Sequence, residues 1–384
     1  MTQNSKFKLQ NSRSAFTLIE VLVVVAVGAA ITTGGFLMFS RYQRDQNVRL
    51  TLSELSASVR DIQRRSVTQE NGKQWGIRIS GTDNSFKTWS GLSYASGTPD
   101  QTYSLKRNIR FGNPPSGFSI DLAFKAITGL LGENRILTVN GGAGSLVGDL
   151  IINTRGKATT RFEEGLMGYW HFDEATSTIA YDASGNGNNG TLTNGPTWQT
   201  SASCRAGECL SFNGTNYVIG PSSNIITGNN LQTITISAWV KTTATGAQYP
   251  VAVKRSSAQS TLISITSNQD LSGNTAIGYL GFLTRNYADS AHSWLVASGG
   301  YNDGRWHHVV GVVNNMTRTL YIDGIQKGTD STQGMQKVSG NTAPLYIGSF
   351  DNSQLFFNGS VDEVRIYDRA LSAQEVLDMY NDLK

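Results

Sequence analysis

The chain has 384 residues, which predicts two or three domains at roughly 150 residues each and excludes a single small module. Charged residues make up only 16 % and there are 41 glycines, so glycine-turned β-structure is favoured and a charged disordered chain is excluded. The formal net charge is +4, but residues 163–384 carry 12 basic against 18 acidic residues, so no nucleic-acid partner is expected for them.

The first 40 residues predict a short leader followed by a membrane helix. Residues 1–15 contain three basic residues and no acidic one, and the apolar stretch 16–39 contains Glu20 as its only charged residue. As an α-helix this stretch would be about 36 Å long, enough for the roughly 30 Å hydrocarbon core of a bilayer. The basic leader predicts that the N-terminus stays cytoplasmic and that the rest of the chain is exported.

A secretory signal peptide is the alternative interpretation of this stretch, because the small residues Gly28 and Ala30 offer a cleavage site. Glu20 argues against it. A carboxylate inside an apolar helix is energetically costly and usually has a partner that compensates for the cost.

The run Ser14–Val25, SAFTLIEVLVVV, resembles the processing site of type IV prepilins and type II secretion pseudopilins. The resemblance implies that a prepilin peptidase cuts between Ala15 and Phe16, and that Phe16 becomes an N-methylated amino terminus. It also implies that Glu20 pairs with the terminal amine of a neighbouring subunit during assembly. The family normally has Gly before the cut, where this chain has Ala15.

Beyond the membrane segment, apolar residues recur at steps of four and three, which places them on one face of a helix that continues to about Thr68. They are Val48, Leu52, Leu55, Val59 and Ile62. Asn71-Gly72 is expected to end the helix. Arg60, Arg64 and Arg65 can be interpreted as an anion-binding patch or as a solvated helix face.

The apolar face of this helix needs a sheet to cover it, and several alternating segments predict strands. The expected strands are 74–80, 85–89, 118–124, 135–139 and 146–153. A long N-terminal helix on a small antiparallel sheet is what pilin-like heads look like, and the run 149–156 resembles a late strand of H-type minor pseudopilins. Between residues 73 and 162 no spacing typical of a catalytic or metal site occurs.

From about residue 163 the sequence is rich in Gly, Asn, Ser and Thr with short apolar runs, which predicts a second domain. Asp323-Gly324 between two apolar runs predicts a tight hairpin, and Ser372 with Glu375 predicts a capped final helix. At least seven short strands favour a β-sandwich. They are expected at 233–241, 277–283, 293–297, 306–313, 319–322, 345–347 and 361–367.

Seven runs in order make this second domain similar to the LamG-like family of the concanavalin A-type lectin/glucanase superfamily. They are GYWHFDE at 168–174, DASGNGNNG at 182–190, LSFNG at 210–214, WV at 239–240, WHHV at 306–309, LYIDG at 320–324 and DEVRIY at 362–367. The resemblance covers residue 166 to the C-terminus and implies a jelly-roll sandwich of two antiparallel sheets. Such domains bind glycans or proteins or act as structural spacers, and many hold a structural calcium.

A calcium ion needs several oxygen ligands, and candidates occur here in glycine-rich loops and at strand ends. They are Asp173, Asp182, Asn186, Asn188 and Asp362. By analogy with the family, Asp173 and Asp362 are the best side-chain candidates. The alternative is that 182–187 is a tight turn whose Asp and Asn bond their own backbone.

Cys204 and Cys209 are the only cysteines, and export favours a disulfide between them. A zinc pair is the competing interpretation, but it lacks two further ligands. Trp170, Trp239 and Trp306 are candidate sugar platforms or core residues. Adjacent strand residues point to opposite faces, so the tandem 307–308 histidines are not expected to chelate one metal ion.

An enzyme is not expected. Glycan-cleaving members of the superfamily need paired carboxylates on one strand face, and no such array occurs. The adjacent pairs Glu163-Glu164 and Asp362-Glu363 would point apart in a strand. A Gly-x-Ser-x-Gly nucleophile elbow is also missing from the sequence.

The sequence therefore predicts an α+β pilin-like module followed by an all-β jelly-roll sandwich. The expected parts are a prepilin leader (1–15), a transmembrane assembly helix (16–40), a pilin-like stalk and head (41–162) and a LamG-like sandwich (163–384). The expected function is a pilin or pseudopilin subunit, held by one helix in the cytoplasmic membrane, that displays a lectin-like domain outside the cell. Its expected partners are other subunits, the peptidase, the membrane, and a glycan or protein ligand. The alternatives are a structural pseudopilus component without glycan binding, and an anchored protein that never polymerises.

Overall fold

The computed structural model describes residues 18–222, 233–245, 249–255, 262–269, 275–285, 293–315, 317–331, 344–351 and 355–384. The chain divides into two compact units, 1–43 and 44–384. The helix α1, Leu18–Val67, runs through the boundary between them. A 3₁₀ turn, Glu70–Gly72, follows α1, and Asn71 takes a left-handed φ of 56° there. The helix therefore ends where the sequence predicts.

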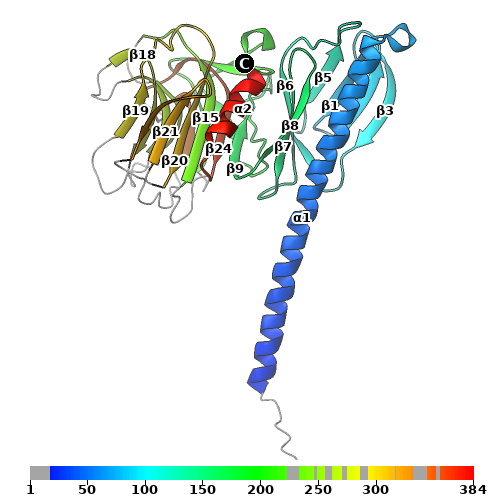
Figure 1. Cartoon of the computed structure of the whole chain (residues 1–384), viewed down its shortest axis with the longest axis horizontal. Coiled ribbons are helices and arrows are strands. Elements are labelled where there is room, and N and C mark those ends of the chain that lie inside the picture. The colour runs from blue at the N-terminus through cyan, green and yellow to red at the C-terminus, as the bar shows by residue number, and fades with distance from the viewer. Residues whose placement is uncertain are drawn as a thin grey trace, which may run out of the picture. The chain divides into compact units, whose positions relative to one another are not determined.

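The second half of α1 is the centre of the pilin-like head. Its predicted apolar face, from Val48 to Ile62, is buried in a core that also contains residues of the strands. Figure 1 shows this part of the helix lying along β1 and β3. The helix packs closely against one strand at a glycine. A Cβ at Gly148 would lie 2.3 Å from a methyl carbon of Leu52.

The head has two four-stranded antiparallel sheets, where the sequence led us to expect one. The first has the order β3-β2-β1-β5 and the second the order β4-β6-β7-β8. The strands are β1 Trp75–Ser80, β2 Ser85–Ser90, β3 Thr98–Ser104, β4 Arg110–Asn113, β5 Ser119–Phe124, β6 Arg135–Asn140, β7 Val147–Ile152 and β8 Ala158–Glu163. Strands β3, β4 and β8 were not predicted. All of β3 is exposed, so it carries no apolar alternation to detect.

The C-terminal part is a sandwich of two antiparallel sheets around one apolar core. The first, called the β14 sheet here, has the order β10-β11-β14-β23-β16-β17-β18-β19. Its strands are β10 Ile179–Ala180, β11 Gly190–Thr193, β14 Tyr217–Ser222, β16 Tyr249–Arg255, β17 Leu262–Gln269, β18 Thr275–Arg285, β19 Ser293–Ala297 and β23 Pro344–Ile347.

The second sheet, called the β15 sheet here, has the order β12-β13-β24-β15-β20-β21-β22, and β9 also pairs with β24. Figure 1 shows β15, β20 and β21 side by side in it. Its strands are β9 Leu166–Trp170, β12 Thr197–Gln199, β13 Cys209–Asn213, β15 Thr233–Lys241, β20 His307–Asn314, β21 Thr317–Ile322, β22 Ile325–Asp330 and β24 Asn358–Tyr367. A 3₁₀ turn, Ser201–Ser203, precedes β13.

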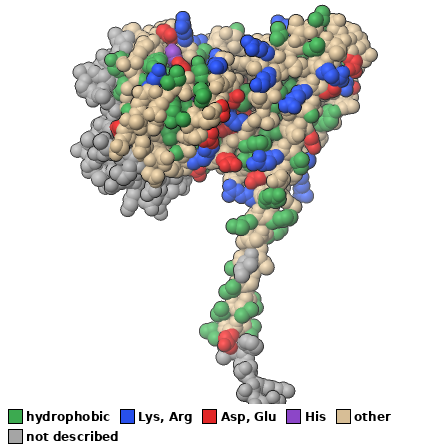
Figure 2. Space-filling view, viewed as in Figure 1, with side chains coloured by type: hydrophobic (Ala, Val, Ile, Leu, Met, Phe, Trp, Pro, Cys, Tyr) green, Lys and Arg blue, Asp and Glu red, His purple; other side chains and the backbone are tan. Residues whose placement is uncertain are grey.

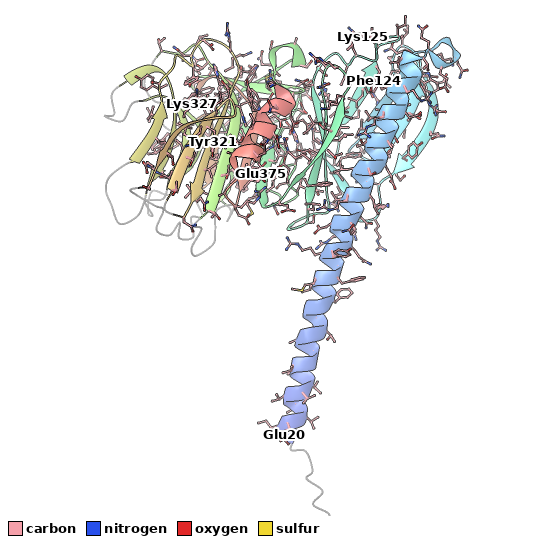
Figure 3. The ribbon with its side chains drawn as sticks, in the orientation of Figure 1. Glu20, Phe124, Lys125, Tyr321, Lys327 and Glu375 are labelled. Atoms are coloured by element: carbon pink, nitrogen blue, oxygen red, sulfur yellow. A yellow bond between two sulfur atoms is a disulfide. The ribbon has the colours of Figure 1, made fainter. Side chains whose placement is uncertain are left out.

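Two local predictions in the sandwich are confirmed. Asp323 and Gly324 both take positive φ, 54° and 75°, in the turn that joins β21 to β22. The final helix α2, Ala373–Leu383, begins with a capping box in which Ser372 and Glu375 bond each other's backbone N–H groups. Figure 3 marks Glu375 at the start of this helix.

Candidate functional site

The first half of α1 presents an apolar surface. Large apolar side chains from Leu18 to Phe39 are exposed, and Figure 2 shows them in green along the helix. Within the described residues α1 is the one helix long and apolar enough to cross a membrane. Glu20 lies in its first turn (Figure 3), and its assembly role stays a prediction. Ala15 and Phe16 lie outside the described residues.

A two-residue link joins the head to the sandwich. Strand β8 ends at Glu163 and β9 begins at Leu166. Gly165 in the link has a left-handed φ of 70°, and a Cβ there would lie 2.5 Å from a carboxylate oxygen of Asp368. The link therefore needs glycine at this position.

Arg161 of β8 is one centre of a buried charged cluster at the junction of head and sandwich. Its guanidinium donates to Glu163 at 2.5 Å and to Asp149 of β7 at 3.4 Å. It also reaches Asp382 of α2 at 2.7 Å, which ties the last strand of the head to the last helix of the sandwich. The one planar guanidinium of Arg161 thus pairs with carboxylates from three elements.

Glu363 of β24 is the second centre. It accepts hydrogen bonds from the Tyr169 hydroxyl at 2.5 Å and from Arg365 at 2.7 Å, and it bonds His171 Nδ1 at 2.8 Å. The other ring nitrogen of His171 bonds the Thr138 hydroxyl of β6 at 2.7 Å. A chain of hydrogen bonds therefore crosses from the sandwich into the head.

The charges of this cluster are shifted by burial and by each other. Burial and the charge of Glu163 raise the pKa of Asp149 to about 6. Burial also acts to raise the pKa of Glu163, but Arg161 and Arg365 outweigh it and lower that pKa to about 2. Glu163 further accepts a hydrogen bond from the Tyr367 hydroxyl at 2.7 Å. Glu163 therefore keeps its charge to a lower pH than Asp149 does, since it has the better partners.

The expectation that Asp362 and Glu363 point apart is wrong. Glu363 takes a positive φ of 54°, and the register of β24 with β15 shifts beside it. Val361 and Val364 both belong to the sandwich core, so the two acids between them share the outer face of the β15 sheet. A β-bulge accounts for this arrangement, because it places one extra residue on a strand.

The outer face of the β15 sheet is covered. Ile136 and Ile151 of the head share an apolar cluster with Trp239 of β15 and Leu383 of α2. Val147 of the head lies in a neighbouring cluster with tyrosines of β9, β21 and β24. This face therefore serves as the docking surface for the head and α2.

The predicted calcium ligands fall into separate places. Asp182 accepts backbone N–H bonds from Tyr169, Ser184 and Asn188 at 2.9 to 3.0 Å. Asn186 and Asn188 direct their amide NH₂ groups at the Met167 carbonyl. These contacts are those of the self-bonded turn that was the alternative interpretation.

Asp173 and Asp362 lie against a different loop, the one that the disulfide closes. Asp173 accepts from the Glu208 N–H at 2.6 Å, and Asp362 accepts from the Arg205 N–H at 2.9 Å. Asp362 Oδ1 is buried without a partner among the described atoms. Across the described ranges no three His, Cys, Asp or Glu side chains form a group that could hold a metal ion. The five predicted ligands therefore do not make one shell.

The predicted disulfide is confirmed. Cys204 and Cys209 are bonded, with their Cα atoms 5.5 Å apart.

The three candidate platform tryptophans have different environments. Trp170 and Trp239 are each 1 % exposed and belong to apolar clusters. Trp306 is half-buried, with Lys241 over its ring at 4.9 Å. The tandem histidines point apart: His308 is buried beside Ser237, whereas His307 bonds Asp323 at the surface.

The arginines at the end of α1 are partly engaged within the head. Arg64 and Arg65 both pair with Asp61, at 2.8 and 2.7 Å. Arg65 also reaches Asp100 of β3 at 3.2 Å. Arg60 is exposed and no pair is found for it in the described part of the chain. The solvated helix face accounts for these contacts.

Comparison with known protein families gives two matches. Residues 212–377 match the family described as the concanavalin A-like lectin/glucanases superfamily, and residues 10–36 match the prokaryotic N-terminal methylation motif. These matches confirm the predicted fusion of the two parts. No curated protein matches the chain.

Several solved structures resemble the sandwich. Domain 4 of AbnA, a GH43 extracellular arabinanase from Geobacillus stearothermophilus in complex with arabinotriose, is 22 % identical, with a TM-score of 0.45 over 56 % of this chain and 98 % of that chain. The binding domain of Paraclostridial mosquitocidal protein 1 is 19 % identical, with a TM-score of 0.44 over 57 % and 52 %. The botulinum neurotoxin serotype D binding domain is 14 % identical, with 0.43 over 56 % and 50 %. The chain spans about half the length of the two toxin domains.

Proposed function

We propose that this chain is a pilin-like subunit, a minor pilin or pseudopilin, that displays its lectin-like sandwich at the cell surface for adhesion. The observation that carries the proposal is the presence of the methylation motif and an exposed apolar helix in one chain with a lectin-like sandwich. The short link and the buried charged junction support it further. They hold the sandwich on the head, so the two are expected to be displayed together.

Mass spectrometry of the N-terminus of protein sheared from cells tests the processing step. We expect a mature chain that begins at methylated Phe16. An intact Met1, or a cut near Ala30, would contradict the proposal and leave an anchored or secreted lectin-like protein.

The assembly step is tested by Glu20→Ala, with Glu54→Ala as the control on the exposed part of the same helix. Loss of the sheared fraction in the Glu20 variant alone is expected, because Glu20 is the charge that assembly would pair in the membrane. Equal surface amounts of both variants, with neither variant in the sheared fraction, would favour an anchored protein that does not polymerise.

The proposed ligand role is non-enzymatic. Asp362 and Glu363 share a face, but Glu363 is bound to His171, Tyr169 and Arg365. It is also fully buried, so this pair has the surroundings of a structural cluster.

For calcium, Asp362 is the candidate that we retain, because its buried Oδ1 suits an oxygen-seeking cation. Thermal unfolding in calcium and in EGTA tests it, since a bound ion stabilises the folded state. A calcium-dependent rise in melting temperature that Asp362→Asn removes is expected. An identical melting temperature in both buffers would exclude the ion.

A further inference from the structure

The sandwich has two broad outer faces, and one of them is occupied within the chain. The outer face of the β15 sheet is covered by the head and by α2. The outer face of the β14 sheet is therefore the one that we consider for a ligand lying across a sheet. The side chains there follow from the alternation along each strand.

Two tyrosines lie on this outer face, on neighbouring strands. Val218 of β14 and Leu345 of β23 point into the sandwich core, so Tyr217 and Tyr346, next to them in sequence, point outward. The two strands pair antiparallel, with Ile219 opposite Tyr346. Tyr217 and Tyr346 are thus diagonal neighbours on one face.

A third aromatic ring completes the group. The ring centroid of Tyr217 lies 5.9 Å from that of Tyr346 and 6.0 Å from that of Phe356, with interplanar angles of 48° and 33°. Tyr217 is the most buried of the three rings, with 7 % of its surface exposed. Tyr346 and Phe356 are half-buried and keep part of their surface in solvent. Within the described part of the chain neither tyrosine hydroxyl makes a hydrogen bond.

The surroundings of these rings select the kind of ligand. On the adjoining strand β11, Thr193 is paired with Tyr217 and Thr191 with Ile219, so hydroxyls border the rings on the same face. Asp351 acts electrostatically on Tyr346, and residues 163–384 carry more acidic than basic residues. An anionic ligand is therefore disfavoured, and a neutral, hydroxyl-rich one is favoured.

We infer that Tyr217, Tyr346 and Phe356 form a binding platform for a neutral oligosaccharide. Aromatic rings offer rigid apolar area to sugar C–H groups, and a tyrosine hydroxyl adds a polar contact at little cost in conformational entropy. The inference rests on the proposed display of a binding domain and assigns its ligand-binding face. It also places the ligand away from Trp306, whose ring lies over the covered side near Trp239.

The test uses the full chain in detergent, applied to an array of neutral and acidic glycans, followed by titration of the best neutral glycan. Tyr346→Ala and Phe356→Ala are compared with Tyr103→Ala. Tyr103 is a suitable control because it is also a partly exposed tyrosine stacked on another ring, that of Phe86, but it lies on the head. Trp306→Ala is included as the rival platform.

We expect at least a tenfold weaker affinity in the Tyr346 and Phe356 variants, with unchanged melting temperatures and with wild-type affinity for Tyr103→Ala and Trp306→Ala. Loss of binding in Trp306→Ala alone would overturn the platform but leave the proposed function standing. Binding of acidic glycans only, or of none, would also overturn the platform. Failure of the proposed function itself would appear separately, as an unprocessed N-terminus in the same preparation.

Discussion

Glu174 is a buried acidic residue of the sandwich domain whose surroundings change its chemistry. Its side chain is 2 % exposed, with Oε1 accepting the Tyr181 N–H at 2.8 Å and Oε2 without a partner among the described atoms. Burial raises the pKa of Glu174 to about 8, and the nearby charge of Asp173 adds to the shift. The group is therefore protonated in the folded protein at neutral pH.

This shift predicts a pH dependence of stability. The folded pKa lies above the unfolded value of about 4.5, so the folded state holds a proton that the unfolded chain has already released. The contribution of Glu174 to the free energy of unfolding should be fully present below about pH 4.5. It should fall as the pH rises towards 8.

Glu174→Gln should remove most of this decrease in the free energy of unfolding at high pH. Glutamine is neutral at every pH, and its side-chain oxygen can still accept the Tyr181 N–H. Urea unfolding of the full chain in detergent between pH 5 and 9 measures the effect, with the exposed Glu164→Gln as the control. At pH 9 the Glu174 variant should exceed the wild type by on the order of 2 kcal/mol or more. Parallel curves for both variants and the wild type would contradict the assignment.

At the scale of single elements, the two halves of α1 have different surfaces. Its first half is apolar on all sides, and its second half has one apolar face that the head covers. Two leucines of the second half allow its buried and exposed faces to be compared. Leu52 is fully buried, and Leu50 is 48 % exposed.

Leu52→Ala should lower the free energy of unfolding by about 2–5 kcal/mol, because it leaves a cavity against Gly148. Leu50→Ala, two positions earlier on the same helix, should change it by less than about 1 kcal/mol. Denaturant titration of the two variants in detergent checks the contrast. Equal losses would mean that the head does not pack on α1 as described.

At the scale of the whole molecule, the buried charged junction predicts that head and sandwich unfold together. Arg161 holds Glu163 and Asp149, both almost fully buried, and also Asp382 of α2. Removing one partner of a buried ion pair typically costs about 3–5 kcal/mol, because a charge is left buried without compensation.

Arg161→Met should therefore split one calorimetric transition into two and make the 164–165 link more sensitive to protease. Arg155→Met, an exposed arginine at the turn before β8, serves as the control. Calorimetry and limited proteolysis give independent readouts. A single, unshifted transition in the Arg161 variant would show that the junction does not couple the two parts.

Much of the architecture was accessible from local sequence patterns. The steps of three and four from Val48 to Ile62 predicted the buried helix face, and alternating segments predicted most long strands. Turn chemistry predicted the hairpin at Asp323 and the helix cap at Ser372. Strand β3 could not be predicted in this way, because an exposed edge strand needs no apolar alternation.

The charged junction was not predicted. Asp149 and Arg365 appeared as isolated charges in predicted strands, where a charge usually faces water, and Arg161 lay outside every predicted strand. One signal that could have been used is that Asp149 is the only charged residue in an otherwise apolar strand.

The sequence by itself determined the methylation motif, the long apolar helix and the two fold classes, because these depend on composition, periodicity and short motifs that act locally. Only the tertiary structure decided which face of the sandwich the head and α2 cover. That outcome depends on residues 225 positions apart, Thr138 and Glu363, meeting through His171. It also depends on one bulge that turns Asp362 and Glu363 to the same side.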